Sequence, residues 1–299
     1  MPKPEISADQ LQRFTFVEAD VRGTVVTLSQ SYRELIGNHQ YPAPAATLLG
    51  QFAAAATLLA TLLKHDASVI IQAHGSGLLS TVMAESDHQL NIRGIVTATD
   101  SEAGIGAIAS DATLDDLLGA ATLAITIQPA QGQRYQGIVN LEGGDLASCL
   151  ERYFNQSEQL QSCVKLAASC DTAAGLILQQ LPPEQAASGA ISDPEQWREL
   201  TLLAGTLKPQ EQLELVHQEQ LTRLFHEHPV NLRDSLPVHF RCSCSAQRTL
   251  TALMALGRDE LQAMIAEQPT TEVICQFCNF PYSFSAGQLS ALISENPVH

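Results

Sequence analysis

Four of the seven cysteines in this 299-residue chain lie near its end, in a pattern that suits a metal ion. They form one Cys-x-Cys pair, Cys242 and Cys244, and one Cys-x-x-Cys pair, Cys275 and Cys278. Zinc in proteins takes tetrahedral sets of four thiolates at about 2.3 Å, and two close pairs let each turn of the chain supply two of them. The spacing therefore predicts a site for one Zn²⁺ per chain, with His239 as a minor substitute ligand.

The same residues could also do redox chemistry. Zinc-bound cysteine is held as the thiolate, which is the form that reacts with oxidants. Oxidation to disulfides would remove the ligands and release the ion, and a bond between Cys242 and Cys244 would close a very small, strained ring that is readily reduced again. These properties suit a reversible switch. Most four-cysteine zinc sites are structural, however, so the spacing alone favours an inert zinc ribbon in a protein-interaction module.

The sequence gives little support for a catalytic function. A thiol oxidoreductase using Cys275 and Cys278 needs an exposed thiol with a lowered pKa, and the pair lacks a thioredoxin-like strand–helix context. The glycine patterns at 75–77 and 104–106 are incomplete as dinucleotide loops, and no G-x-x-x-x-G-K-[ST] motif is present. No Ser/His/Asp set or carboxylate pair stands out. We therefore expect no enzyme and no ATP-driven reaction.

The composition limits the kinds of partner that the chain can bind and the compartment in which we expect it. The net charge is −16 and the pI is about 4.8, so the chain repels nucleic acid and anionic membranes. Cys149, Cys163 and Cys170 fit no ligand pattern and are interpreted as small buried hydrophobes. An odd cysteine count and a start without an apolar signal region indicate a reducing cytoplasm, where such spacing means metal or redox chemistry.

Three segments are expected to position the cysteines. Residues 1–183 mix strand-like runs with helices and predict an α+β core domain. Within it, residues 45–63 are weakly hydrophobic for a membrane span and predict a helix buried against a sheet. Residues 184–235 predict an acidic helical linker, and residues 236–299 predict a small four-cysteine zinc domain with a helix over 250–265.

The linker carries an apolar stripe. One helix is expected to start at Asp193-Pro194, with the aspartate as N-cap, and a second to run from Gln210 to about Glu227. The segment has nine acidic and four basic side chains and too few apolar ones for a core of its own. We expect the stripe to pack on the core domain, and its residues are Trp197, Leu200, Leu203, Leu213, Val216, Leu221 and Leu224.

The zinc domain should depend on its ion. A module of this size buries little surface and holds only a few kcal/mol through its core. Zinc binding contributes roughly 10–16 kcal/mol in small cysteine-rich modules, and that energy becomes folding free energy. Loss of zinc should therefore unfold residues 236–299.

Several stretches together resemble a known family. They are Phe240-Arg241-Cys242-Ser243-Cys244-Ser245, the run from Cys275 to Phe284, Arg93-Gly94, the run Tyr153-Phe154-Asn155-Gln156-Ser157-Glu158-Gln159, and residues 175–182. Over nearly its full length the chain is similar to the 33 kDa chaperonins, a family of redox-regulated heat-shock chaperones. All four ligand positions of the family are filled. Cys149, Cys163 and Cys170 are outside the family signature.

The resemblance implies an ATP-independent holdase for unfolding proteins under oxidative stress. It implies that the reduced, zinc-bound form is inactive. It also implies that oxidation forms the disulfides Cys242–Cys244 and Cys275–Cys278 and releases zinc, after which the tail and linker unfold and a homodimer binds clients. The apolar stripe of the linker is then the candidate client-binding segment. The sequence does not fix the client range, the oxidant threshold or the oligomeric state of the reduced form.

Overall fold

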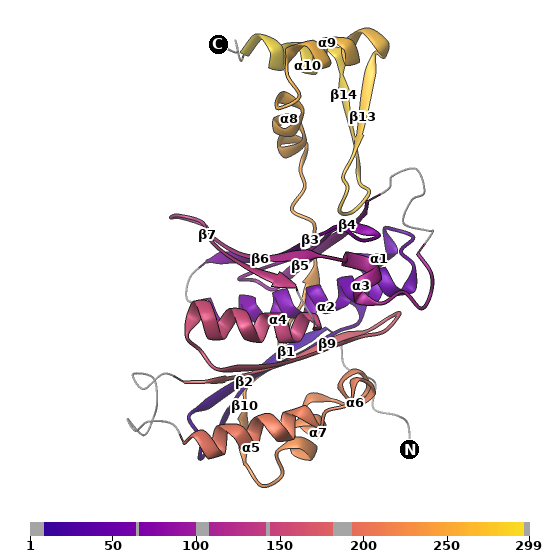
Figure 1. The fold of residues 1–299 in the computed structure, drawn as a ribbon. Helices are drawn as coiled ribbons and strands as arrows, with labels where there is room; N and C mark the ends of the chain where they lie inside the picture. The colour runs from indigo at the N-terminus through magenta and orange to yellow at the C-terminus, as the bar shows by residue number, and fades with distance from the viewer. Residues whose placement is uncertain (1–8, 64–65, 100–107, 142–143, 182–192, 296–299) are drawn as a thin grey trace, which may run out of the picture. The chain divides into compact units, whose positions relative to one another are not determined.

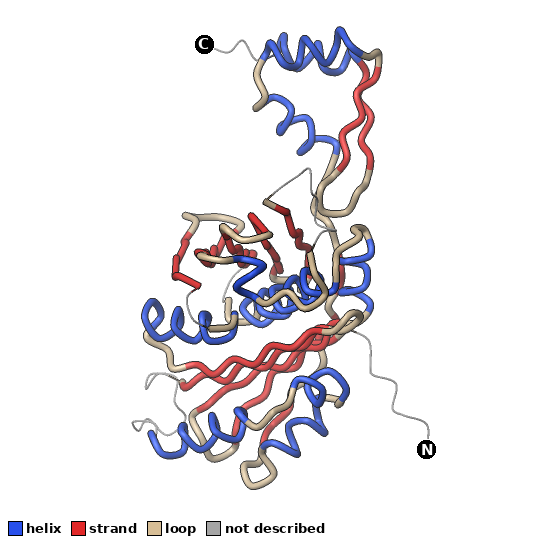
Figure 2. The backbone as a smooth tube through the Cα atoms, turned by 45° about the vertical axis from the view of Figure 1, so that its right-hand side comes forward, coloured by secondary structure: helices blue, strands red, loops and turns tan. Residues whose placement is uncertain are grey.

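The computed structural model describes residues 9–63, 66–99, 108–141, 144–181 and 193–295 (Figures 1 and 2). The chain forms two compact units, Met1–Arg241 and Cys242–His299, called here the N-terminal and the C-terminal unit. Both mix helices and sheets, so the predicted α+β class is confirmed. The predicted zinc segment starts at residue 236, six residues before the boundary between the units.

Two sheets build the N-terminal unit. Sheet A has the order β10-β1-β2-β9-β8, with β11 also pairing with β1, and every pairing is antiparallel. Its strands are β1 (Gln10–Phe16), β2 (Val21–Leu28), β8 (Ser162–Ala168), β9 (Ala173–Gln180), β10 (Val230–Leu232) and β11 (Leu236–Pro237). Sheet B has the order β12-β5-β4-β3-β6-β7. Its strands are β3 (Ala67–Gly75), β4 (Leu79–Asp87), β5 (Asn91–Ala98), β6 (Ala121–Pro129), β7 (Tyr135–Leu141) and β12 (His239–Phe240).

A single apolar helix, α2 (Ala43–Ala60), lies between the two sheets (Figure 1). It is long and apolar enough to cross a membrane, but 78% of its length is buried inside the protein. Small residues allow the close approach: a Cβ on Gly50 would lie 2.9 Å from the Ala168 side chain, and one on Gly94 would lie 2.9 Å from Leu49. The predicted buried helix is confirmed, and Gly94 of the Arg93-Gly94 pair has a packing role.

Shorter helices close the inner core. They are α1 (Gln30–Gly37), α3 (Leu114–Leu118), α4 (Leu146–Tyr153) and the π-helix η2 (Phe154–Glu158). Asp145 caps α4 by accepting a hydrogen bond from the Ser148 amide. The buried faces of these elements join α2 and the inner faces of both sheets in one large apolar cluster.

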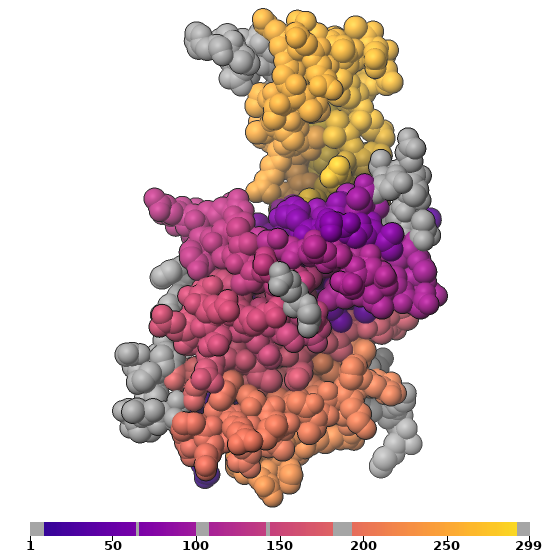
Figure 3. All heavy atoms as spheres, in the orientation of Figure 1, coloured from indigo at the N-terminus to yellow at the C-terminus, as the bar shows by residue number. Residues whose placement is uncertain are grey.

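The outer face of sheet A is covered by three helices: α5 (Pro194–Gly205), α6 (Pro209–Glu214) and α7 (His217–Leu224). Figure 3 shows this orange segment at the bottom of the view, directly adjoining the pink residues of the same unit. Because both faces of sheet A are covered, β2 and β9 are buried along almost their whole length.

Two expected helices are each divided in two. The helix predicted over Gln210–Glu227 breaks at Leu215 and Val216, which are extended, although neither glycine nor proline is there. The break lets Gln212 and His217 both reach sheet A, so tertiary hydrogen bonds override helix propensity. The helix predicted over 250–265 ends at Met254 and restarts at Arg258, because Gly257 adopts a left-handed φ of +94°.

The C-terminal unit contains α8 (Ala246–Met254), α9 (Arg258–Glu267), the hairpin β13 (Thr270–Ile274) and β14 (Pro281–Ser285), and α10 (Ala286–Glu295). Among the side chains of this unit that the structure describes, the buried apolar ones are Leu253, Leu261, Phe284 and Leu289. Five further side chains are partly buried against them. The core of this unit is therefore very small, as expected for the cysteine segment.

Candidate metal centre

The four predicted ligands meet in the C-terminal unit. The sulfur atoms of Cys242, Cys244, Cys275 and Cys278 all lie within 4.8 Å of one another. The Sγ atoms of Cys242 and Cys275 are 3.7 Å apart, and those of Cys244 and Cys278 are 3.5 Å apart. Four sulfurs bound tetrahedrally at 2.3 Å from an ion would be about 3.8 Å from each other. The cluster therefore has the size and donor set that a tetrahedral metal ion needs.

The second cysteine pair sits on the loop that joins β13 to β14. The Asn279 amide donates to the Cys275 carbonyl at 2.8 Å, and the Cys275 amide donates to the Phe280 carbonyl at 3.0 Å. Asn279 has φ of 55°, a left-handed conformation that asparagine tolerates better than most residues. This tight loop turns both thiols toward one point.

The first pair lies on extended chain just before α8. Ser245 caps that helix by accepting from the Arg248 amide at 3.2 Å. The Arg248 guanidinium then reaches back to the Ser243 carbonyl at 2.9 Å and to its hydroxyl at 2.7 Å. Arg248 therefore fixes the residue between the two cysteines, a role that sequence reasoning did not identify.

Tyr282 is a second residue that the sequence pattern left without a role. Its hydroxyl donates to the Cys244 sulfur at 3.1 Å. Burial would raise the pKa of Cys244, but the hydrogen bonds from Tyr282 and the neighbouring thiols lower that pKa below its ordinary value. The same hydrogen bond is the main reason that the pKa of Tyr282 rises to about 12. Burial raises the pKa values of Cys242 and Cys278. The centre thus favours thiolate at Cys244.

A model of the Hsp33 protein family matches residues 9–285 of the chain. The chain belongs to the Hsp33 family. The resemblance seen in the sequence is thereby confirmed, and the members of this family are chaperones.

Individual Hsp33 relatives match over nearly the whole length. The 33 kDa chaperonin of Pseudomonas savastanoi pv. phaseolicola is 43% identical over 295 residues, which cover 97% of this chain and 95% of the relative. The 33 kDa chaperonin of Ectopseudomonas mendocina is 44% identical over 287 residues, which cover 96% of this chain and 95% of the relative. The crystal structure of a 33 kDa chaperonin from Thermotoga maritima matches with a TM-score of 0.78 and 21% identity, over 96% of this chain and 98% of that one. This last likeness supports the Hsp33 fold.

His239 and the remaining cysteines lie outside the four-cysteine cluster. His239 is exposed on β12, whose backbone pairs with β5, and it is not in the ligand group. Cys149 and Cys163 are buried, as predicted, and burial raises the pKa of each, in Cys163 to about 11. Cys170 is exposed, so the prediction that it is buried is wrong. It lies in the turn between β8 and β9, where no apolar layer covers it.

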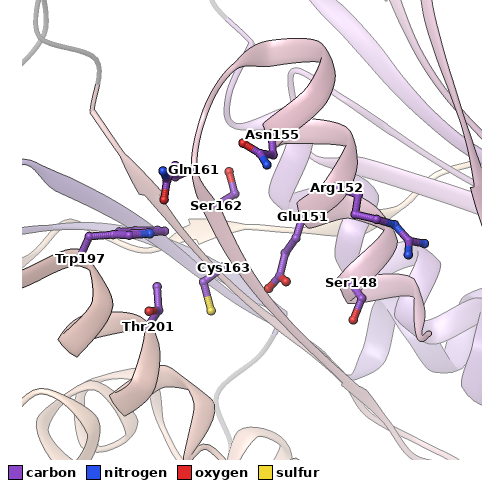
Figure 4. A pocket seen from close by; sticks show the side chains of 9 residues that line it. All are labelled: Ser148, Glu151, Arg152, Asn155, Gln161, Ser162, Cys163, Trp197 and Thr201. Carbon is purple, nitrogen blue, oxygen red and sulfur yellow. The ribbon is translucent and has the colours of Figure 1, made fainter. Parts of the chain in front are cut away.

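Cys163 marks the place where the linker meets the core. It lines a cleft of about 480 Å³ between α4, β8 and α5 (Figure 4). Trp197 of α5 and Glu151 of α4 face each other across this cleft, and Glu151 accepts a hydrogen bond from the Val164 amide at 2.7 Å. Because Trp197 is the single tryptophan of the chain, its fluorescence reports on the position of α5.

The apolar stripe of the linker contributes to a second apolar cluster of the N-terminal unit. Leu200, Leu221 and Leu224 are buried there, and Trp197 and Leu203 pack on its edge. Leu213 and Val216 are half-buried and are not among its members. The cluster is completed by Ala204 and Phe225, and by Phe14, Phe16, Val21, Val25, Cys163, Leu176 and Leu178 of sheet A.

Buried polar side chains also fasten the linker, and the sequence pattern gave no signal for them. His217 is 1% exposed and its ring nitrogens contact the Thr27 hydroxyl at 3.0 Å and the Gln12 side-chain oxygen at 2.9 Å. Gln212 donates to the Lys165 carbonyl at 3.0 Å. Burial lowers the pKa of His217 to about 4, so the docked linker holds this imidazole neutral.

Proposed function

We propose that this chain is a redox-regulated holdase whose reduced, zinc-bound form is inactive. Membership of a chaperone family supports the first half of this statement. The observation that carries the second half is the clustering of four thiols in a unit with a small core, in which four of the apolar side chains that the structure describes are buried. Such a unit depends on its ion for stability, and the same thiols are the groups that oxidants attack.

Zinc is the ion that the donor set fits best, because four thiolates in a tetrahedron are its usual structural environment. Cys242, Cys244, Cys275 and Cys278 would hold it, and the ion would supply folding energy rather than catalysis. The Tyr282 hydroxyl and the Arg248 guanidinium would orient the first pair. Such supporting contacts commonly strengthen metal binding.

Oxidation releases the ion through two disulfides. In each pair, one thiolate attacks a peroxide oxygen, which breaks the O–O bond and gives a sulfenic acid and hydroxide. The second thiolate attacks the sulfenic sulfur, forms the S–S bond and expels the second hydroxide. Each disulfide therefore consumes one peroxide and two protons and yields two waters.

We assign the disulfides to Cys242–Cys244 and Cys275–Cys278. Two Sγ–Sγ contacts, of 3.7 and 3.5 Å, instead join Cys242 to Cys275 and Cys244 to Cys278. The ion holds these cross-pairs together, so they separate when it leaves, whereas the sequence neighbours remain within reach of each other. The family resemblance supports the same pairing.

Activation exposes the apolar surface that the linker covers. With helices α5–α7 displaced, Phe14, Phe16 and Leu178 of sheet A and the linker stripe itself would face water. Exposed apolar area of this kind binds unfolding proteins or another copy of the chain. We propose that the linker of residues 184–235 is the switching segment and that the active form is a homodimer acting in the cytoplasm without ATP or nucleic acid.

One experiment follows zinc, linker and activity together. The reduced, zinc-loaded full chain is treated with peroxide at heat-shock temperature while a chromogenic chelator records zinc, Trp197 fluorescence records α5, and light scattering records aggregation of a heat-denatured client. We expect zinc release, a fluorescence red shift and suppressed aggregation to rise together. Cys170→Ser, which changes an exposed cysteine outside the cluster, should behave as wild type.

Two outcomes would contradict the proposal. Retention of zinc after peroxide and heat would favour an inert structural zinc site in an interaction module. Zinc release without suppression of client aggregation would separate the metal chemistry from the chaperone activity. Disulfide mapping by peptide mass spectrometry checks the pairing in the same samples.

A further inference from the structure

A small cavity opens at the end of the sheet sandwich, where α2 stops. It has a volume of about 280 Å³ and is bounded by α2, sheet A, sheet B and the π-helix η2. Most of its wall is apolar. The lining consists of Leu59, Leu62, Leu63, Val69, Ile125, Ile127, Tyr153, Phe154 and Leu160, with Arg22, Glu158 and Gln179 as the charged and amide groups.

The cavity lining includes the cationic side chain of Arg22, whose hydrogen-bond partner is unusual for a guanidinium. It lies on the inner face of β2 directly opposite Gln179 of β9, and its Nε and Nη2 atoms donate to the Gln179 amide oxygen at 3.2 and 2.9 Å. That partner is neutral. Among the described residues no carboxylate forms an ion pair with Arg22. A half-buried guanidinium of this kind lacks an anion.

The surroundings of Arg22 make a neighbouring anion more favourable. Desolvation by burial, and then the neighbouring charge of Arg13, lower the pKa of Arg22. A second cavity of about 560 Å³ shares Arg22 and Leu62 with the first and is also lined by Arg13, Arg233 and Asp234. The first cavity is therefore an apolar chamber of about 280 Å³ that meets the arginine-lined second cavity at Arg22 and Leu62. A negative charge beside Arg22 would relieve both the desolvation and the repulsion from Arg13.

The wall opposite Arg22 is the run Tyr153–Gln159, which the proposed redox switch does not use. Its residues 154–158 form a π-helix, a rare element that is frequent at functional sites. The Tyr153 hydroxyl donates to Glu158 at 3.0 Å, and Gln159 ends the element in a left-handed conformation with φ of 54°. This geometry turns Phe154 inward and keeps the acid of Glu158 at the rim, where it is exposed.

We propose that this cavity binds a small amphiphilic carboxylate, with its alkyl chain among Leu59, Val69 and Ile125 and its carboxylate on Arg22. An arginine fork matches a carboxylate, and the apolar chamber matches the chain. The chamber is too small for a folded or extended peptide segment. Glu158 and Asp234 at the rim disfavour a dianion such as a phosphate monoester, so the ligand is a monoanion.

Binding of this kind would act on the N-terminal unit alone. The ligand would contact α2 and both sheets at once, so it would stabilise the folded N-terminal unit by mass action. It would involve none of the four clustered cysteines, and the inference therefore stands or falls independently of the redox switch.

The test uses the reduced, zinc-loaded full chain and octanoate below its micelle concentration. Isothermal titration should show saturable one-to-one binding, and the melting temperature should rise with octanoate concentration. Acetate, which lacks the chain, should not bind. Octanol, which lacks the carboxylate, should bind roughly 10- to 100-fold more weakly, because charge-assisted hydrogen bonds to the arginine are lost.

Variants locate the site. Arg22→Gln should weaken octanoate binding by the same factor and leave octanol binding unchanged, Arg22→Lys should fall between, and Arg258→Gln, an exposed arginine that lines neither cavity, should bind as wild type. Non-saturable uptake, or equal affinities for octanoate and octanol, would overturn the proposal even if Arg22→Gln fails to fold. Undiminished octanoate affinity in a folded Arg22→Gln protein would overturn it as well.

Discussion

The two units of this protein reach a folded state by different means. The N-terminal unit buries a long helix between two sheets and covers the outer face of sheet A with three more helices, so most of its buried side chains contact other apolar groups. In the described part of the C-terminal unit, four apolar side chains are buried and four thiols lie within 4.8 Å of one another.

The difference shows where a small chemical signal can have a large structural effect. Removing a few groups from a large apolar core changes stability by a few kcal/mol. Removing an ion from a unit with almost no core removes most of its folding energy. The C-terminal unit is therefore the part of the chain suited to sensing, and the covered face of sheet A is a surface suited to exposure in response.

The largest effect is expected from metal removal. Zinc supplies roughly 10–16 kcal/mol to small cysteine-rich modules, more than this core can replace. Treatment of the reduced protein with a strong chelator should abolish amide hydrogen-exchange protection over residues 242–295, while β2, β9 and α2 stay protected. Unchanged protection in the C-terminal unit of the zinc-free protein would show that the contrast between the units is wrong.

A smaller effect is expected from weakening the linker directly. Leu221 is fully buried in the cluster beneath α7, so Leu221→Ala should destabilise the docked linker by about 2–5 kcal/mol. The reduced variant should show faster hydrogen exchange over α5–α7 and partial chaperone activity without oxidant. Leu202→Ala is the matched control, because Leu202 is 63% exposed, and it should stay within about 0.5 kcal/mol of wild type. An inactive Leu221→Ala protein with an undocked linker would separate exposure of sheet A from activity.

Acid should loosen the linker through His217. Its pKa is about 4 when docked, against an ordinary value of 6.5, so the undocked state takes up the proton first as the pH falls. Docking stability is complete above pH 6.5 and should decrease by about 2 kcal/mol between pH 6.5 and pH 5. Trp197 fluorescence and hydrogen exchange over α7 measure this loss.

The control for this pH effect is the variant itself. In His217→Gln the amide can still contact Thr27 and Gln12 but does not titrate, so the loss should become much smaller, whereas exposed His226→Gln should leave it intact. The same pH dependence in His217→Gln would assign the effect to the carboxylates.

The smallest effect concerns Tyr282. Tyr282→Phe removes one hydrogen bond to the Cys244 sulfur and should lower zinc affinity roughly fivefold in competition with a chelator. Phe280→Leu alters the ring that lies 5.0 Å from Tyr282 without touching a hydroxyl, so its zinc affinity should match that of the wild type. Equal affinities in Tyr282→Phe and wild type would leave the hydroxyl without a role in the centre.

Residue types and their spacing were enough to predict the four-cysteine cluster, the α+β class and the buried helix α2. Ligand spacing is a local property, since each pair is held by one short turn, and a long apolar run has few ways to be buried. Gly257 could also be read from the sequence as a residue that favours a helix end, but the prediction of one helix over 250–265 did not take it into account.

The remaining features of the fold and of the cysteine cluster could be seen only in the tertiary structure. It revealed the strands β10–β12, which are too short to show a pattern and exist because β1 and β5 offer edges for pairing. It broke the linker helix at Leu215 so that His217 and Gln212 could bond sheet A, and it placed Tyr282 and Arg248 on the first cysteine pair. Except for Arg248, whose partner Ser243 is five residues away, these features depend on contacts between residues far apart in the chain, about which local propensity carries no information.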